Sequence, residues 1–274
     1  MNRFYTRKYL NVTCFHSYTP EPKQDLFERH CHDYFEILYV VRGEGKYVVE
    51  GVEYPLKPQT LLLTRPYEFH YVCPDVSSEY ERYVLHFELS ALIDSAAFLS
   101  ILQSGSGAGH GVYFPAESLS DAVRSVFSEI DLACEMFANS SHRAAREETM
   151  VRADLTRLLF FLSQAKPETV SSDDENIVTR VIDHINQNLI REISLDELAQ
   201  QFFVSKYYLC HAFRKQTGVS VFTYINTKRI AMAQQLLANG EPATSVAYAV
   251  GYGTYSSFYR AFCKQTGHPP AHKR

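Results

Sequence analysis

The spacing of hydrophobic residues divides the chain into a front part with strand character and later parts with helical character. Between residues 30 and 90, short β-branched and aromatic runs are broken by glycine and proline, as in YFEILYVVRGEGKYVVEGVEYPLKP. Antiparallel strands with turns at this spacing predict a small β-barrel. After residue 118, apolar residues recur at three- and four-residue steps, which predicts helices. We therefore expect an α+β fold.

Residues 118–165 carry two apolar stripes of helical spacing, separated by the polar stretch ANSSHRAAREE. The first stripe consists of Val123, Val126, Phe127, Ile130 and Phe137. The second stripe consists of Met150, Val151, Leu155, Leu158, Leu159 and Leu162. A stripe of this width buries one side of a helix. The sequence therefore predicts a pair of antiparallel helices after the barrel.

The heptad AFRKQTG at residues 212–218 returns as AFCKQTG at residues 261–267. Each copy forms the second half of a predicted helix that follows a shorter helix, and Ser194 with Glu197 caps the first short one. Three pairs of residues correspond: the N-caps Ser205 and Thr254, the buried Phe213 and Phe262, and the C-cap glycines Gly218 and Gly267. A short helix, a tight turn and a second helix are typical of a helix-turn-helix unit.

Two further helices complete this all-α part. The first is predicted from the stripe of Ile177, Val178, Val181, Ile182, Ile185 and Leu189. The second, SVFTYINTKRIAMAQQLLANG, joins the two units through an apolar side of Phe222, Ile225, Ile230, Ala233, Leu236 and Leu237. About 18 helical residues span ~27 Å, close to the ~34 Å turn of B-DNA. One chain could thus present two recognition helices to successive major grooves.

The outer faces of the two recognition helices carry polar, basic and aromatic side chains suited to base edges and phosphates. In the first helix these are Lys206, Tyr207, Cys210, His211 and Arg214. In the second they are Tyr255, Ser256, Tyr259 and Arg260. A helical protein–protein module whose basic charge is incidental is the alternative interpretation.

The charge distribution favours double-stranded DNA as the partner. Residues 176–274 hold 11 Lys+Arg against 5 Asp+Glu, a balance of +6, whereas the first 175 residues hold 16 against 26, a balance of −10. The stretch KPETVSSDDEN at residues 166–176 is polar and acidic and predicts a linker.

Composition narrows the class of protein. The 46% hydrophobic content over 274 residues allows a core in each of two domains. We find no signal-like apolar run at the start and no stretch near the ~18 apolar residues of a membrane span, so we expect a cytoplasmic protein without a membrane partner. The six cysteines form no CxxC pair, which favours free thiols over disulfides or a zinc site.

Residues 177–274 resemble the DNA-binding domain of the AraC/XylS family of bacterial transcription regulators. The matching stretches are LAQQFFVSKYYLCHAFRKQTGVSVFTYINTKRIAMAQQLL and SVAYAVGYGTYSSFYRAFCKQTGHPP, at the family's spacing. The resemblance implies base-facing roles for Tyr207, Cys210, His211, Tyr255, Ser256, Tyr259 and Arg260. Cys210 and Tyr255 depart from strong hydrogen-bonding types, so the first helix should discriminate less through direct hydrogen bonds. Arg229 matches a recurrent family arginine, for which a phosphate contact and a structural bond stay open.

The segment HCHDYFE places His30, His32 and Glu36 two and four residues apart, so that in a strand all three would leave one face. With Gly43, the segment resembles the first motif of the cupin barrel. A counterpart of the second motif, PLKPQTLLLTRPYEFH, would bring His70 near the trio. Three imidazoles and a carboxylate form a sound ligand shell for Zn, Fe, Mn or Ni.

The sequence departs from the metal-binding cupin form in three places. Gln24 and Gln59 stand where glycine is usual, and the spacing from Pro66 to His70 is one residue short. We therefore expect no metal and no cofactor, and place a pocket for a small polar organic effector, such as a sugar, at His30, His32, Glu36 and His70. A metal centre at these residues and a purely structural polar cluster are the alternatives. The parity of Leu85, Phe87 and Leu89 predicts that His86 faces outward.

Together these observations predict two domains: a cupin-like antiparallel β-barrel with a helical pair, then an all-α double helix-turn-helix. Residues 1–165 would bind the effector and dimerise through the helical pair, as the resemblance implies, unless that pair only closes the barrel. Residues 166–176 would be the linker and 177–274 the DNA-binding domain. The expected function is an effector-responsive, homodimeric transcription regulator that is not an enzyme. A cupin metalloenzyme or metal sensor with a DNA-binding domain, and an architectural DNA binder without a ligand, are the alternatives.

Overall fold

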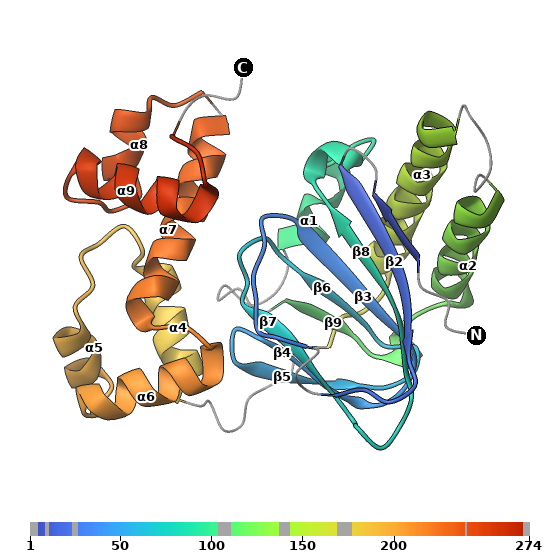
Figure 1. Ribbon diagram of the computed structural model, residues 1–274, viewed down its shortest axis with the longest axis horizontal. Coiled ribbons are helices and arrows are strands. Elements are labelled where there is room, and N and C mark those ends of the chain that lie inside the picture. The colour runs from blue at the N-terminus through green and yellow to red at the C-terminus, as the bar shows by residue number, and fades with distance from the viewer. Residues whose placement is uncertain are drawn as a thin grey trace. The chain divides into compact units, whose positions relative to one another are not determined.

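The computed structural model describes residues 5–8, 11–23, 27–103, 111–136, 143–168, 177–238 and 240–270. Two compact units make up the chain, an N-terminal unit of strands and helices and a C-terminal helical unit (Figure 1). Gln24, Phe137 and most of the predicted linker lie outside the described residues, so the boundaries at 165 and 177 stay a prediction. No helix in the described ranges is long and apolar enough to cross a membrane.

The strands of the N-terminal unit form two antiparallel sheets, which corrects the predicted closed barrel. The larger sheet has the order β1–β2–β8–β3–β6–β9: Tyr5–Lys8, Val12–Thr19, Tyr80–Phe87, Phe35–Arg42, Leu61–Thr64 and Val112–Phe114. The smaller has the order β5–β4–β7: Val52–Leu56, Gly45–Val49 and His70–Pro74.

The chain leaves the larger sheet at the turn between β3 and β4, and this turn separates the two sheets. Gly43 and Gly45 adopt φ angles of 94° and 149°, where glycine is favoured. A Cβ at these positions would lie 2.5 Å from the Glu79 carbonyl oxygen and 2.3 Å from that of Cys73. The close backbone approach therefore requires glycine, and it directs β4 into the second sheet instead of continuing the first.

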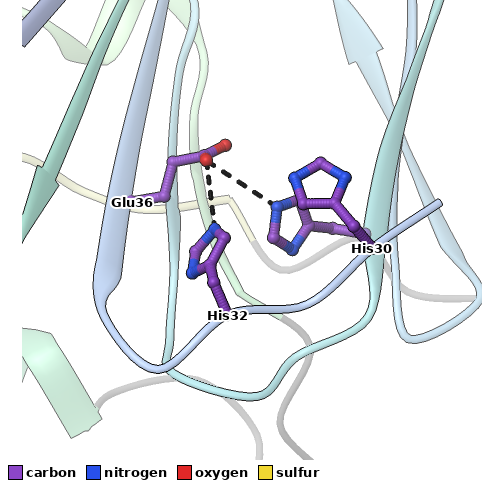
Figure 2. A group of neighbouring side chains, drawn as sticks. His30, His32 and Glu36 are labelled. Atoms are coloured by element: carbon purple, nitrogen blue, oxygen red, sulfur yellow. Dashed lines mark hydrogen bonds and ion pairs between the residues drawn. The ribbon is translucent and has the colours of Figure 1, made fainter. Parts of the chain in front are cut away.

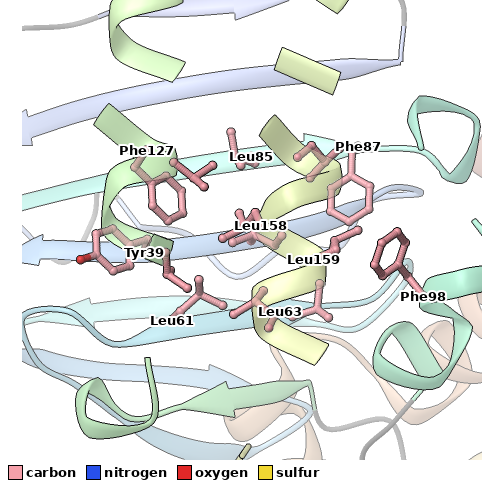
Figure 3. Packing of buried hydrophobic residues seen from close by; sticks show 14 of the residues in the cluster. Tyr39, Leu61, Leu63, Leu85, Phe87, Phe98, Phe127, Leu158 and Leu159 are labelled. Atoms are coloured by element: carbon pink, nitrogen blue, oxygen red, sulfur yellow. The ribbon is translucent and has the colours of Figure 1, made fainter. Parts of the chain in front are cut away.

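The larger sheet is buried on both faces. One face contributes Ile37, Tyr39, Leu61, Leu63, Leu85 and Phe87 to a core with the helices, shown in Figure 3. The other face contributes Leu38, Val40 and Leu62 to a second core, together with Tyr47, Val49, Tyr54 and Leu56 of the smaller sheet. Because side chains alternate along a strand, β3, β6, β8 and β9 each supply both cores.

Helices α1 (Leu99–Gln103), α2 (Asp121–Met136) and α3 (Arg143–Gln164) cover one face of the larger sheet (Figure 1). The predicted stripes supply the buried side of α2 and α3, from Val123 to Ile130 and from Val151 to Leu162. Met150 is an exception, because its side chain is exposed. Short 3-10 helices lie at Leu89–Ala91, Ala96–Phe98 and Ala116–Ser118.

The C-terminal unit is helical, as predicted: α4 (Ile177–Gln187), α5 (Leu195–Gln201), α6 (Lys206–Thr217), α7 (Val221–Ala238), α8 (Ala243–Ala249) and α9 (Tyr255–Thr266). Ser194 and Glu197 form the predicted capping box of α5. The predicted stripe of α4 is buried except at its two ends: Ile177 is half-buried at the start of the helix, and the helix stops before the half-buried Leu189.

The duplicated heptad makes the same bonds in both copies. Ser205 and Thr254 each cap a helix by accepting a backbone N–H, and Gly218 and Gly267 end the helices at φ angles of 83° and 77°. The Thr217 hydroxyl donates to the Phe213 carbonyl at 2.8 Å and lies 3.1 Å from the Val219 carbonyl oxygen. The Thr266 hydroxyl repeats this pattern with Phe262 and His268. The repeated residues therefore end α6 and α9 with the same hydrogen bonds and the same glycine conformation.

Phe222 is the exception on the long helix α7. The sequence placed it on the apolar stripe, but its side chain is 72% exposed, whereas Ile230, Ala233 and Leu237 enter the core of the second helix-turn-helix unit. Phe222 is the second residue of α7. Its apolar character therefore did not decide its burial.

Candidate functional site

The four residues predicted for the effector pocket converge at one end of the two sheets. Glu36 is the second residue of β3 and His70 the first of β7. His30 and His32 lie in the segment before β3, so the prediction that one strand carries all three was wrong. His30 instead pairs with His70 through backbone N–H···O bonds of 3.1 and 2.9 Å. The cluster is thus assembled by pairing between distant segments.

Glu36 is the centre of this cluster (Figure 2). Its Oε2 atom lies 3.2 Å from Nε2 of His32 and 2.7 Å from Nε2 of His86. The Nε2 atom of His70 lies 3.7 Å from the same oxygen. Its Oε1 atom accepts a hydrogen bond of 2.8 Å from the Tyr47 hydroxyl. Both oxygens of this buried carboxylate are therefore engaged by protein groups.

His86 belongs to the cluster, which corrects the prediction that it faces outward. The register of β3 and β8 places His86 opposite Glu36, so both side chains leave the sheet on the same face. Leu85 and Phe87 do have the opposite parity, but they enter the core under the helices. The parity was read correctly, and the error lay in assuming that only one face of the sheet is buried.

The electrostatics of the cluster follow from one buried carboxylate among imidazoles. Burial raises the pKa of Glu36, but the charge of His70 and hydrogen bonds from the histidines outweigh it and hold this pKa well below its usual range. Burial lowers the pKa of His70, but Glu36 raises it by more, and the net shift is upward. Burial lowers the pKa of His30 and His32, which favours neutral imidazoles there.

Three of the histidines are oriented as metal ligands usually are. The Nδ1 atoms of His30, His32 and His70 lie 2.8, 3.0 and 2.8 Å from the carbonyl oxygens of Glu28, Tyr34 and Glu68. A carbonyl can only accept, so each Nδ1 carries the proton and leaves Nε2 as a possible ligand atom. One ligand atom from each of these histidines and from Glu36 all lie within 4.8 Å of one another. The residues fit a divalent metal such as Zn²⁺ or Fe²⁺.

Gln59 bears on the cupin resemblance. This residue stands where the motif usually has glycine, and its φ angle is 70°, in the left-handed region that glycine adopts at low cost. The turn before β6 therefore holds this glutamine in a conformation that glycine would adopt at lower cost.

A cleft of about 660 Å³ extends from this cluster along the inner face of the larger sheet. His30, Glu36 and His86 line one end of it, whereas His32 and His70 contact Glu36 without lining the cleft. Its walls are Phe15, Phe27, Leu38, Val72 and Val84, and Ser17, Glu28, Arg29 and Arg82 add polar groups. Apolar walls with a few placed polar groups are typical of a small-molecule site.

The two recognition helices present the predicted residues to solvent. Exposed are Lys206, Tyr207, Cys210, His211 and Arg214 on α6, and Ser256, Tyr259 and Arg260 on α9. Tyr255 is half-buried against Phe258, with ring centres 6.0 Å apart. Lys206 forms an exposed ion pair of 2.7 Å with Asp196, so the Asp196 carboxylate partly neutralises its charge.

Arg229 has a structural role. Its Nε atom donates to the Leu189 carbonyl at 2.8 Å and its Nη2 atom to the Arg191 carbonyl at 2.7 Å. Its guanidinium also lies over the Tyr252 ring, 5.6 Å from the ring centre. Of the two roles left open for Arg229, a phosphate contact and a structural bond, the structure therefore shows the structural bond.

Of the residues that line the cleft, sequence reasoning predicted only His30 and Glu36, and His86 and Arg82 are among those it missed. Both lie on β8 at positions of the same parity, and Val84 between them lines the cleft as well. The alternation along YERYVLHF indicates that these three residues share one face of the strand. It predicts a buried position for them only if both faces of the sheet are taken as buried.

The comparisons with known proteins agree with this architecture. Residues 16–153 match the family model of an AraC-like ligand-binding domain, and residues 198–274 match that of a helix-turn-helix domain. An uncharacterized HTH-type transcriptional regulator, YfiF of Bacillus subtilis, is 25% identical over 88% of this chain and 76% of its own length. The transcriptional activator RhaS of an Enterobacter species is 24% identical over 92% of this chain and 88% of its own length.

Among solved structures, ToxT of Vibrio cholerae aligns over 96% of this chain and 97% of its own, with 13% identity and a TM-score of 0.38. The family assignment rests on the two domain matches, which together span both units, and on the full-length relatives. The chain belongs to the AraC family of DNA-binding transcription regulators, with an N-terminal ligand-binding domain and a C-terminal helix-turn-helix domain.

Proposed function

We propose that the cleft of the N-terminal unit is the effector site of this regulator. The cleft itself carries the proposal, because it combines apolar walls with polar groups from His30, Glu36 and His86 at one end. A small organic molecule with polar groups fits this lining. The effector would change transcription by binding two conformations of the chain with different affinity, since only such a difference can shift their populations.

A thermal-shift screen of the full-length protein against sugars, organic acids and divalent metals tests this proposal. A compound that binds the folded state alone must raise the Tm by mass action. The expected result is an organic compound that raises the Tm of the wild-type protein and loses its effect in His86→Ala. An equal response of both proteins would place the effector outside the cleft.

We also propose that α6 and α9 read DNA through their exposed residues. The basic balance of this part of the chain and the exposure of Arg214 and Arg260 support this role. The DNA-binding role also favours a cytoplasmic location, where a regulator of this family meets its operator.

Arg260→Ala should weaken binding to an operator selected from random DNA by about 1–3 kcal/mol if the guanidinium reads a base. In that case the preference at one base pair should relax, whereas a phosphate contact would weaken all sequences alike. Fluorescence anisotropy on the operator and its single-base variants measures both effects. Gln235→Ala, an exposed position on α7, is the control and should bind as the wild type does. Unchanged binding by Arg260→Ala would contradict the assignment.

A homodimer formed through α2 and α3 is supported by their outer faces. Leu132, Met150 and Phe160 are 56%, 42% and 54% exposed there, an apolar surface that a second copy would cover. A single mass equal to the monomer in sedimentation analysis at micromolar concentration would exclude this proposal.

A metal centre is the second candidate for the His–Glu cluster, favoured by the three carbonyl-anchored imidazoles. The ion would be held by His30, His32, Glu36 and His70 and would neutralise the buried carboxylate. The N-terminal unit could then serve as a metal sensor. We do not propose an enzyme, because the relatives that align over most of the chain are transcription regulators.

A further inference from the structure

Arg82 lines the cleft four residues along β8 from His86 of the His–Glu cluster. It lies within β8, opposite Ser17 of β2 and Val40 of β3 in the strand register. Its guanidinium carbon is 5.0 Å from the centre of the Phe27 ring and 4.8 Å from that of the Tyr80 ring. Two aromatic rings therefore hold the cationic group at the cleft wall.

The guanidinium has no anionic partner in the described part of the chain. Its Nη1 atom is buried and makes no hydrogen bond there, and neither does the buried hydroxyl of Tyr80, whose ring it contacts. Glu36 does not serve as the partner, because protein donors engage both of its oxygens. A buried charged donor without a partner keeps its desolvation cost. Proteins retain such costly groups where function requires them.

We propose that the effector is a small organic anion whose carboxylate or phosphate group binds Arg82. This inference rests on the proposed function, in which the cleft is the effector site. A guanidinium offers parallel N–H donors that match the two oxygens of a carboxylate or phosphate, and the interaction strengthens away from water. A neutral sugar would leave the charge of Arg82 without an anionic partner among the described residues.

The strand geometry adds a second constraint on the effector. Arg82 and His86 are four residues apart on β8, which corresponds to roughly 13 Å at ~3.3 Å per residue. Leu38, Val72 and Val84 line the cleft between its ends. The fitting molecule therefore has an anionic group at one end, a less polar middle, and hydroxyl or carbonyl groups that face His30 and His86.

The test compares wild-type protein with Arg82→Met, which removes the charge but keeps an unbranched apolar side chain beside Phe27 and Tyr80. Arg29→Met is the matched control, because Arg29 also lines the cleft but is exposed and lies over the Tyr71 ring, with its Nη2 atom 3.2 Å from the hydroxyl. The Tm of each full-length protein is measured alone and with glucose, glucuronate, glucose 6-phosphate and hexanoate. Calorimetry then gives the Kd of any compound that raises the Tm.

Without ligand, Arg82→Met should melt at the same temperature as the wild type or higher, since it removes a half-buried charge that has no anionic partner among the described residues. A clear fall in Tm for Arg82→Met, but not for Arg29→Met, would show that Arg82 is structural and would overturn the inference.

With ligand, an acidic probe should raise the wild-type Tm and bind Arg82→Met roughly 10- to 100-fold more weakly. A response to glucuronate or hexanoate identifies a carboxylate, and one to glucose 6-phosphate identifies a phosphate. A Tm increase with glucose that persists in Arg82→Met but is lost in His86→Ala would overturn the proposal that the effector is an anion. The cleft would remain the effector site. A response that survives both substitutions would contradict the proposed function itself.

Discussion

Phe262→Ala should lower the free energy of unfolding of the C-terminal unit by about 3–5 kcal/mol. The Phe262 side chain is 1% exposed and packs with Phe258, Val246 and Ile230 in the core of the second helix-turn-helix unit. Alanine would remove the ring and leave a cavity that the surrounding helices fill only in part. Because α9 has 12 residues and such a helix is marginal alone, operator binding should fall with its packing.

Urea unfolding followed by far-UV circular dichroism measures this change, and it suits a chain without tryptophan. Amide hydrogen exchange should show the loss of protection in α9 first. Phe222→Ala is the control, since this phenylalanine of the same unit is 72% exposed and should change stability by no more than about 0.5 kcal/mol. A loss below about 1 kcal/mol for Phe262→Ala would show that the duplicated phenylalanine is not an anchor of the unit.

Glu36→Ala should destabilise the N-terminal unit by about 3–5 kcal/mol, the usual cost of removing one partner from a buried charged network. Two donors lose their acceptor at once: the Tyr47 hydroxyl and the Nε2 atom of His86. His70, whose pKa the carboxylate raises, loses its counter-charge as well. Glu36→Gln keeps the volume and one acceptor, so it should cost less than Glu36→Ala.

The same urea titration compares both variants with Glu44→Ala, an exposed glutamate of the β3–β4 turn, which should stay within about 0.5 kcal/mol of the wild type. Equal stability of Glu36→Ala and the wild type would contradict a structural role for the carboxylate. Addition of EDTA tests whether the His–Glu cluster binds a metal ion. An ion bound at the cluster stabilises the folded state, so chelation should then lower the Tm of the wild type and not that of Glu36→Ala.

Local signals account for how well the C-terminal unit was predicted. The hydroxyl caps, the apolar stripes and the terminal glycines each act within one or two helical turns, so a linear reading detects them. The failures there concern exposure. Phe222 has an apolar side chain at an apolar position, yet no neighbouring element covers it. Whether a residue of an apolar stripe is buried depends on which other elements pack against it. The spacing of the stripe gives no information about those elements.

The sequence by itself determined the helix-turn-helix repeat, the basic charge balance of the part that carries it, and the residue types of the His–Glu cluster. Only the tertiary structure decided that His86 joins Glu36 across 50 residues and that Arg82 lines a cleft without an anionic partner among the described residues. The physical reason lies in the sheet. Alternation assigns a strand residue to one of two faces, but strand register selects its neighbours, and packing on both sides decides which face holds a core and which holds a cleft.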